Sequence, residues 1–163
     1  MQKFTQPEFF QRRVIKQSNG NVLHALKNTD DEFLRFGEVY ISKINKRSIK
    51  GWKKHNSAHL NLVVTSGDVR FVALAESAHD AFKVLDIRMS EANHGLLVVP
   101  PGFWLAFGAY DESDATIINI STEVHDPNES VSVPFEVYKD HWTANETELG
   151  FDEHLFRSST QDI

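Results

Sequence analysis

Short apolar runs separated by turn-forming residues dominate the chain, and they predict an all-β protein. Residues 59–65 give the clearest strand pattern, and residues 96–99 form a continuous apolar run typical of a strand buried on both faces. Clusters such as Pro100-Pro101-Gly102 interrupt the runs at the spacing expected of a sandwich or barrel. We therefore expect about eight to ten short strands and no long amphipathic helix between them.

Two turn signals predict local hairpins. The triplet at 66–68, Ser-Gly-Asp, lies between the apolar runs 59–65 and 69–74, which predicts that these two strands pair with each other. The sequence Ser-Asn-Gly-Asn at 18–21 tolerates positive φ angles and predicts a second hairpin over residues 14–26.

The two ends of the chain carry weaker patterns. Residues 8–15 are compatible with a short helix or an extended arm, and the acidic stretch 140–163 with a docked tail or a short helix. The 163 residues suffice for one domain with a sizeable core, which we place at about residues 20–135. Because no apolar run resembles a signal sequence or a membrane span, we expect a cytoplasmic protein without a membrane partner.

Composition and charge narrow the possible functions. The chain contains no cysteine, which excludes disulfides, thiolate nucleophiles and Cys-ligated metal sites. Its net charge is −6, yet residues 41–67 contain six Lys or Arg residues and no Asp or Glu, so the remainder carries −12. A broad basic face for nucleic acid is therefore not expected. A local cationic stretch on an acidic protein favours a site for a small anion.

The centre of this cationic stretch, residues 49–55, is predicted to be a short strand whose Lys and His side chains are candidates for catalysis or binding. Regular alternation would place Lys50, Trp52 and Lys54 on one face, and Lys53 and His55 on the other. Lys53 and His55 could supply an amine and an imidazole at this strand.

The sequence resembles a known family through four short motifs in a fixed order. They are Gly51-Trp52-Lys53-Lys54-His55, then Leu60-Asn61-Leu62 leading into 66–72, then Pro100-Pro101-Gly102-Phe103-Trp104-Leu105-Ala106-Phe107, and finally 119–129 with His125-Asp126-Pro127. Together these look like the dTDP-4-dehydrorhamnose 3,5-epimerase-like branch of the cupins over roughly residues 20–135.

The resemblance implies a fold, a partner and a reaction. The fold would be a cupin-type jelly-roll β-barrel, or double-stranded β-helix, with short peripheral helices, in a homodimer. The ligand would be a nucleotide-diphosphate 4-keto-6-deoxysugar, most often dTDP-linked, used for cell-surface polysaccharide such as lipopolysaccharide. Lys and Arg side chains suit its diphosphate. The candidate catalytic residues are Lys53, His55 and His125, and the candidate substrate-binding residues are Lys50, Lys54, His59, Asn61, Trp104 and Asn119.

The sequence departs from the family at four positions, which implies a non-standard set of catalytic groups. Lys53 stands at the position of the family's base His, Asn119 at that of its acid Tyr, and Leu105 and Leu60 at those of a second His and a Lys. The metal-binding pattern of other cupins is absent, so we expect neither a metal nor another cofactor.

Structural alternatives exist for each candidate residue. Lys53 and His55 could belong to a solvated strand edge, and His125 could fix a turn. His59 could be a surface residue, Trp104 a core residue, and Asn119 a partner of backbone groups. At the level of function, the alternatives to an epimerase or isomerase are a non-catalytic nucleotide-sugar-binding protein and a jelly-roll interaction domain without a small ligand.

Overall fold

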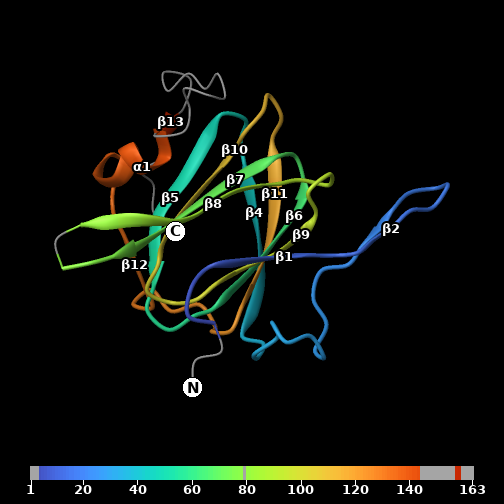
Figure 1. Cartoon of the computed structure of the whole chain (residues 1–163), viewed down its shortest axis with the longest axis horizontal. Coiled ribbons are helices and arrows are strands. Elements are labelled where there is room, and N and C mark those ends of the chain that lie inside the picture. Colours follow the sequence, from blue (N-terminus) through green and yellow to red (C-terminus); the bar gives the residue numbers. More distant parts are fainter. Residues whose placement is uncertain (1–3, 79, 144–156, 159–163) are drawn as a thin grey trace.

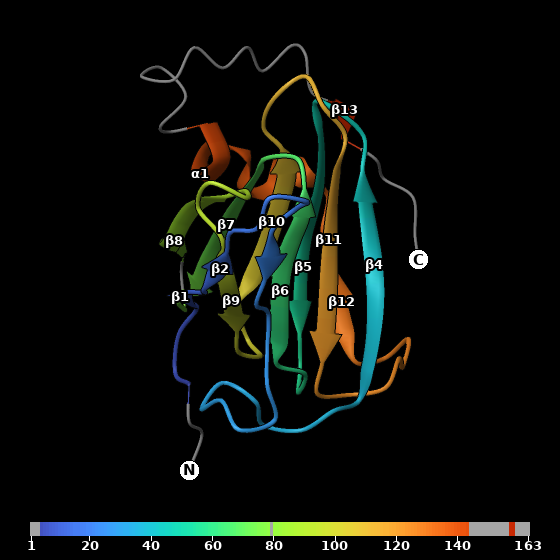
Figure 2. The ribbon, with the colours of Figure 1, turned by 90° about the vertical axis from the view of Figure 1, so that its right-hand side faces the viewer.

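Two antiparallel sheets face each other and enclose the main core (Figures 1 and 2). The computed structural model describes residues 4–78, 80–143 and 157–158. One sheet has the order β1-β9-β6-β11-β4, with bounds Glu8–Gln11, Gly95–Val99, Leu60–Ser66, Ala115–Ser121 and Glu38–Ile44. The other has the order β12-β5-β10-β7-β8, with bounds Ser130–Ser132, Ser48–His55, Trp104–Ala109, Val69–Glu76 and Ala81–Met89, and β13 (Arg157–Ser158) pairs in parallel with β5. The all-β prediction is confirmed.

The core between the sheets follows from strand alternation. On β6, Leu60, Leu62 and Val64 point inward, and on β7 Phe71 and Ala73 meet them from the other sheet. All five are buried, and side chains two positions apart on a strand share a face. The inner layer is therefore built by every second residue, as the sequence pattern predicts for a jelly roll.

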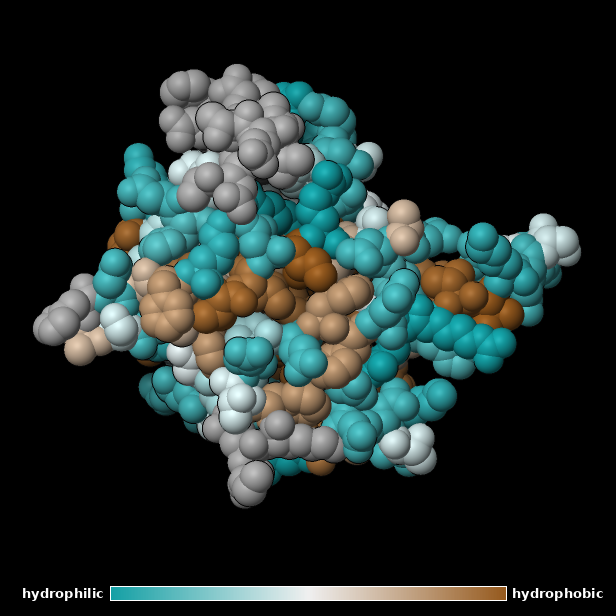
Figure 3. All heavy atoms as spheres, viewed as in Figure 1, coloured by the Kyte–Doolittle hydropathy of each residue, from teal (hydrophilic) through white to brown (hydrophobic). Residues whose placement is uncertain are grey.

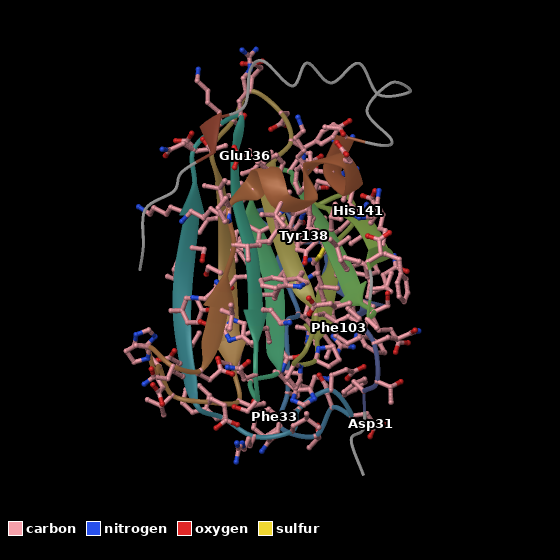
Figure 4. The ribbon with its side chains drawn as sticks, turned by 90° about the vertical axis from the view of Figure 1, so that its left-hand side faces the viewer. Asp31, Phe33, Phe103, Glu136, Tyr138 and His141 are labelled. Atoms are coloured by element: carbon pink, nitrogen blue, oxygen red, sulfur yellow. The ribbon has the colours of Figure 1, made fainter. Side chains whose placement is uncertain are left out.

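Each sheet also has a covered outer face. The N-terminal segment packs Phe4 and Phe10 over Val63, Leu96 and Val98 of the first sheet. On the second sheet, the 3₁₀ helix η1 (Phe135–Tyr138) and the short helix α1 (Lys139–Thr143) cover a second cluster. Figure 4 shows the labelled Tyr138 in this helical cover, where its ring contacts those of Trp52 and Trp104.

The predicted hairpin between β6 and β7 is wrong. The turn at 66–68 exists, but β6 lies in the first sheet and β7 in the second, so the chain crosses from one sheet to the other there. Gly67 has φ +78°, and a Cβ atom at this position would lie 2.7 Å from the Asp114 carbonyl oxygen. The tight turn therefore reflects close packing at the end of the barrel, since only glycine fits there without strain.

The N-terminal region forms strands and not a helix. Residues 8–15 contain β1 and β2 (Val14–Ile15), and β2 pairs with β3 (Val22–Leu23), which confirms the second predicted hairpin. This hairpin extends away from the barrel in Figure 1, and an apolar patch is visible on it in Figure 3. Val22 is exposed, while Val14, Ile15 and Leu23 are half-buried.

The C-terminal prediction is tested only in part. A short helix exists, but it is α1 at Lys139–Thr143, and most of the range 140–163 lies outside the described residues. Within the part of the chain that the structure describes, no helix is long and apolar enough to cross a membrane.

Trp142 should anchor the helical cover, because it is the one residue of α1 whose side chain is buried. It is 1% exposed and packs against Phe135 with ring centroids 6.1 Å apart. We expect Trp142→Ala to lower the free energy of unfolding by about 3–5 kcal/mol, measured by urea denaturation. Val131→Ala, at a residue that is 46% exposed on β12, serves as control and should change it far less.

Candidate active site in the barrel interior

A β-bulge in β5 determines which of its side chains enter the barrel. Lys50 pairs with Phe107 and Lys53 pairs with Leu105 on β10, so Gly51 and Trp52 together stand opposite the single residue Ala106. Gly51 has φ +135°, and a Cβ atom there would lie 2.6 Å from the Ala106 Cα atom. Glycine is required at this bulge by both its backbone conformation and its close packing.

The bulge corrects the predicted alternation of this strand. Leu105 belongs to the inner core and Phe107 packs against it, so their cross-strand partners Lys53 and Lys50 face inward together. Trp52 belongs to the outer cluster beneath the helices. His55, two residues after Lys53, is inward as well. The extra residue therefore brings three polar side chains to one face that regular alternation would have divided between two.

The inward lysines differ from Lys54 in their electrostatic partners. Lys54 lies on the outer face, where its Nζ sits 4.6 Å from the Trp104 ring centroid and forms an ion pair with Glu76. Among the described residues, no carboxylate lies within salt-bridge distance of Lys50 or Lys53. Two half-buried ammonium groups without a local counter-ion, inside an acidic protein, favour an anionic ligand.

Glu129 is held by an array of donors at the end of β5. Its Oε1 accepts hydrogen bonds from the backbone amides of Asn56 at 3.1 Å, Ser57 at 2.9 Å and Ala58 at 2.8 Å. Burial disfavours ionisation, but the Ser57 and Ala58 amides and His55 outweigh it and lower the Glu129 pKa to about 2. Glu129 is therefore a fixed negative charge at neutral pH.

This carboxylate also orients His55. Glu129 Oε2 is hydrogen-bonded to His55 Nδ1, and the two side chains are 12% and 17% exposed. An ionised carboxylate can only accept, so Nδ1 carries the hydrogen and Nε2 of the neutral ring carries the lone pair. The pair has the arrangement of a general base with its orienting carboxylate.

The opposite wall of the interior is formed by β4 and β11. Ser42 and Tyr40 alternate inward from the core residue Ile44, although Tyr40 is still 38% exposed, and Val39 and Ile41 lie exposed on the other face. The neighbouring strand contributes the buried Asn119, whose Nδ2 donates to Ser42 Oγ at 3.1 Å and lies 3.4 Å from the Tyr40 carbonyl oxygen. Asn119 thus ties the two strands of this wall together.

Four other predicted site residues lie away from this interior. Trp104 is buried in the outer cluster beneath the helices, and Asn61 is buried on the outer side of β6, between the inward residues Leu60 and Leu62. His59 precedes Leu60, and burial, followed by the charge of Arg35, lowers its pKa. His125 is exposed in the loop before β12. These four residues and Lys54 therefore do not share the inner face on which Lys50, Lys53 and His55 lie.

Glu129 and Tyr40 were not among the predicted site residues. The sequence does contain a turn signal before Glu129, in Asp126-Pro127-Asn128. In the structure, Asp126 Oδ1 accepts a hydrogen bond from the Asn128 amide at 2.8 Å, and the Asp126 carbonyl accepts one from the Glu129 amide at 3.0 Å. That signal marks the turn but cannot identify a partner as distant in sequence as His55. In the sequence pattern, Tyr40 is only one of several apolar residues of a predicted strand.

No metal-binding cluster of three or more His, Cys, Asp or Glu side chains is present among the residues that the structure describes.

Comparison with solved structures identifies the fold as the cupin-type jelly roll. A dTDP sugar isomerase from Desulfovibrio desulfuricans is 25% identical, with a TM-score of 0.73 over 81% of this chain and 86% of that one. The dTDP-4-dehydrorhamnose 3,5-epimerase from Sulfolobus tokodaii is 17% identical, with a TM-score of 0.73 over 96% and 92%. The sugar 3,4-ketoisomerase QdtA from Thermoanaerobacterium thermosaccharolyticum, in complex with TDP, is 14% identical, with a TM-score of 0.64 over 88% and 97%. No protein-family model and no curated protein matches the sequence.

Replacement of Glu129 should change how the free energy of unfolding depends on pH. The Glu129 pKa is about 2 in the folded protein against 4.5 for an unperturbed glutamate, so its ionised form stabilises the fold above pH 4.5, and this contribution is lost between pH 4.5 and 2. Glu129→Gln should lower the free energy of unfolding by at most about 3 kcal/mol at pH 7. The difference from wild type should shrink as the pH falls towards 2.

Urea denaturation at several pH values measures this difference. Glu91→Gln is the control, since Glu91 is exposed and accepts a hydrogen bond from Asn21 Nδ2. A wild-type-to-Glu129→Gln difference that stays constant from pH 7 to 2 would mean that the Glu129 charge does not stabilise the fold.

Proposed function

We propose that the protein is an epimerase or isomerase of nucleotide-diphosphate 4-keto-6-deoxysugars, with dTDP as the nucleotide, in the biosynthesis of cell-surface polysaccharide. The observation that carries this proposal is the His55–Glu129 pair beside two inward lysines, in a fold shared with dTDP-sugar isomerases and epimerases. Base, carboxylate and cations are the groups that proton abstraction next to a ketone requires.

In this proposal His55 is the base. Glu129 fixes the ring so that Nε2 receives the proton, and its negative charge stabilises the imidazolium that forms. The base thus comes from a position two residues after Lys53, which stands where the resembling epimerases carry theirs. The bulge at Gly51 places both residues on the inner face, so Lys53 remains close to the reacting carbon although it is not the base.

Lys53 is proposed to stabilise the enolate oxygen, and Lys50 to bind the diphosphate. Residues two apart on a strand are separated by roughly 7 Å, so an amine at 53 and an imidazole at 55 can reach adjacent atoms of one sugar ring. Lys50 lies farther along the same inner face, where the nucleotide end of the ligand would extend. This division assigns one positive charge to the reaction and one to binding.

A non-catalytic nucleotide-sugar-binding protein is the second candidate. It is favoured by the residues at the resembling family's base and acid positions, since Lys53 and Asn119 are unusual there and Asn119 bonds to Ser42. Both candidates predict that dTDP raises the melting temperature. Only the enzyme predicts exchange of substrate hydrogens with solvent.

Exchange in deuterated water tests the proposed base. Wild-type protein incubated with dTDP-4-keto-6-deoxyglucose should incorporate deuterium at a carbon next to the ketone, followed by NMR and mass spectrometry. His55→Gln should reduce the exchange rate by about 10²-fold or more, because the base is lost. His141→Gln on α1 is the control and should exchange at the wild-type rate. Wild-type protein that binds dTDP but shows no exchange with 4-keto-6-deoxysugars would support the binding protein instead.

Lys53 and Lys54 form a matched pair for testing the role of the inner face. Lys53→Met should lower kcat for exchange by about 10²–10³-fold, the range typical for loss of an oxyanion stabiliser. Lys54→Met removes the same charge one residue later but from the outer face, so kcat should remain near wild type. Equal losses in both variants would show that overall charge, and not placement in the barrel, is responsible.

A further inference from the structure

We propose that a cavity at the root of the β2–β3 hairpin binds a small dianionic oxyanion, such as inorganic phosphate or the phosphate group of a small monoester. The cavity has a volume of about 260 Å³. It lies where the segment between β1 and β2 meets the segment that follows β3, at the point where the hairpin leaves the barrel in Figure 1. This site is separate from the barrel interior and does not depend on the proposed sugar chemistry.

A second cationic stretch of the sequence supplies the charge of this cavity. Residues 9–29 contain four Lys or Arg residues and no Asp or Glu, in a chain whose net charge is −6. Three of the four, Arg12, Arg13 and Lys27, line the cavity, and Asp30 is the one carboxylate among the described residues that line it. Three cations against one carboxylate leave an excess of two positive charges. An excess of positive charge around a concave space favours an anion.

Hydrogen bonds between the two segments form the frame of the cavity. The His24 amide donates to the Arg13 carbonyl oxygen at 3.0 Å, and Arg12 Nε donates to the Ala25 carbonyl oxygen at 3.0 Å. The backbone on both sides of the cavity is therefore fixed before a ligand binds. A preformed site binds more tightly, because little conformational freedom is lost on binding.

The three cations of the lining differ in their partners. Arg12 is balanced by carboxylates, since its Nη2 lies 2.9 Å from Glu32 Oε2 and 3.8 Å from Asp30 Oδ2. Asp30 Oδ2 also accepts a hydrogen bond from the Lys27 amide at 2.9 Å. The Arg13 and Lys27 side chains are exposed, and no carboxylate of the described part of the chain forms an ion pair with either. These two cations, one from each segment, are available to a ligand.

The size and charge of the cavity define the class of ligand. Sites for drug-sized ligands have volumes of about 300–1,000 Å³, so this cavity suits a molecule smaller than a nucleotide sugar. A guanidinium group binds two oxygens of a phosphate or carboxylate at once, and an ammonium group adds a point charge. A dianion matches the two excess positive charges of the lining.

The cavity lies on the opposite side of the first sheet from the barrel interior. Its lining residues Ala25 and Leu26 pack against the cluster on the outer face of that sheet, whereas Lys50 and Lys53 lie on the inner face of the other sheet. An anion in this cavity is therefore not the diphosphate of a sugar nucleotide in the barrel. Since one segment precedes the hairpin and the other follows it, the anion would tie both ends of the hairpin together.

Titration with inorganic phosphate in a chloride buffer tests this site. Excess dTDP fills the barrel, and NMR follows the backbone amides of residues 11–13 and 24–30, which should shift at millimolar phosphate. Arg13→Gln and Lys27→Gln should each weaken phosphate binding by about tenfold or more, because each removes a charge-assisted hydrogen bond. Lys16→Gln is the matched control, since Lys16 is an exposed cation of the same stretch that does not line the cavity. It should bind phosphate as the wild type does.

Glycerol 3-phosphate and succinate distinguish the sources of such a dianion. Tighter binding of glycerol 3-phosphate than of phosphate would identify a phosphate monoester as the ligand, and tighter binding of succinate would identify a dicarboxylate. Absence of shifts at residues 11–13 and 24–30 with all three anions would overturn the proposal.

Two further results would also contradict the site. Equal weakening in Lys16→Gln and Arg13→Gln would mean that the stretch attracts an adventitious ion only, and shifts confined to β5 would place the phosphate in the barrel. If dTDP does not bind, which counts against the proposed function alone, the Lys50→Met/Lys53→Met variant replaces it as the means of keeping phosphate out of the barrel. Melting temperatures within about 2 °C of wild type show that the variants are folded.

Discussion

The bulge at Gly51 is the constraint on which the site depends. Two residues of β5 oppose one residue of β10, and the strand changes faces between Lys50 and Lys53. Without the extra residue, Lys53 and His55 would point at the helical cover, where Trp52 now packs in an aromatic cluster. The bulge thus places the Trp52 indole in the outer core, and the Lys53 amine and the His55 imidazole on the inner face. Glycine permits both because nothing larger fits against Ala106.

The two walls of the interior have different chemical characters. The wall from β5 carries lysines and an imidazole backed by a carboxylate, whereas the wall from β4 and β11 carries a phenol, a hydroxyl and an amide. The two lysines therefore stand on one side of the interior, whereas Glu38 on β4 adds a negative charge to the other.

The sequence predicted the strands better than their partners or their faces. Apolar alternation is a property of neighbouring residues, so β6, β7 and β10 were found, yet the crossing at Gly67 looked like a hairpin turn because both need the same residues. His55 was identified, but Glu129 was not, since their contact depends on the path of the chain between them. Lys53 faces inward because of the bulge, and the alternation of apolar and polar residues in the sequence does not show where a bulge occurs.

Glu129 directly precedes β12, an edge strand of three residues that pairs with the end of β5. Its carboxylate joins that strand to the loop at 56–58 and to the ring of His55. Short edge strands open more readily than the centre of a sheet. Whenever β12 separates from β5, the imidazole loses its orienting partner. The order of a small peripheral strand therefore determines how firmly an imidazole inside the barrel is held.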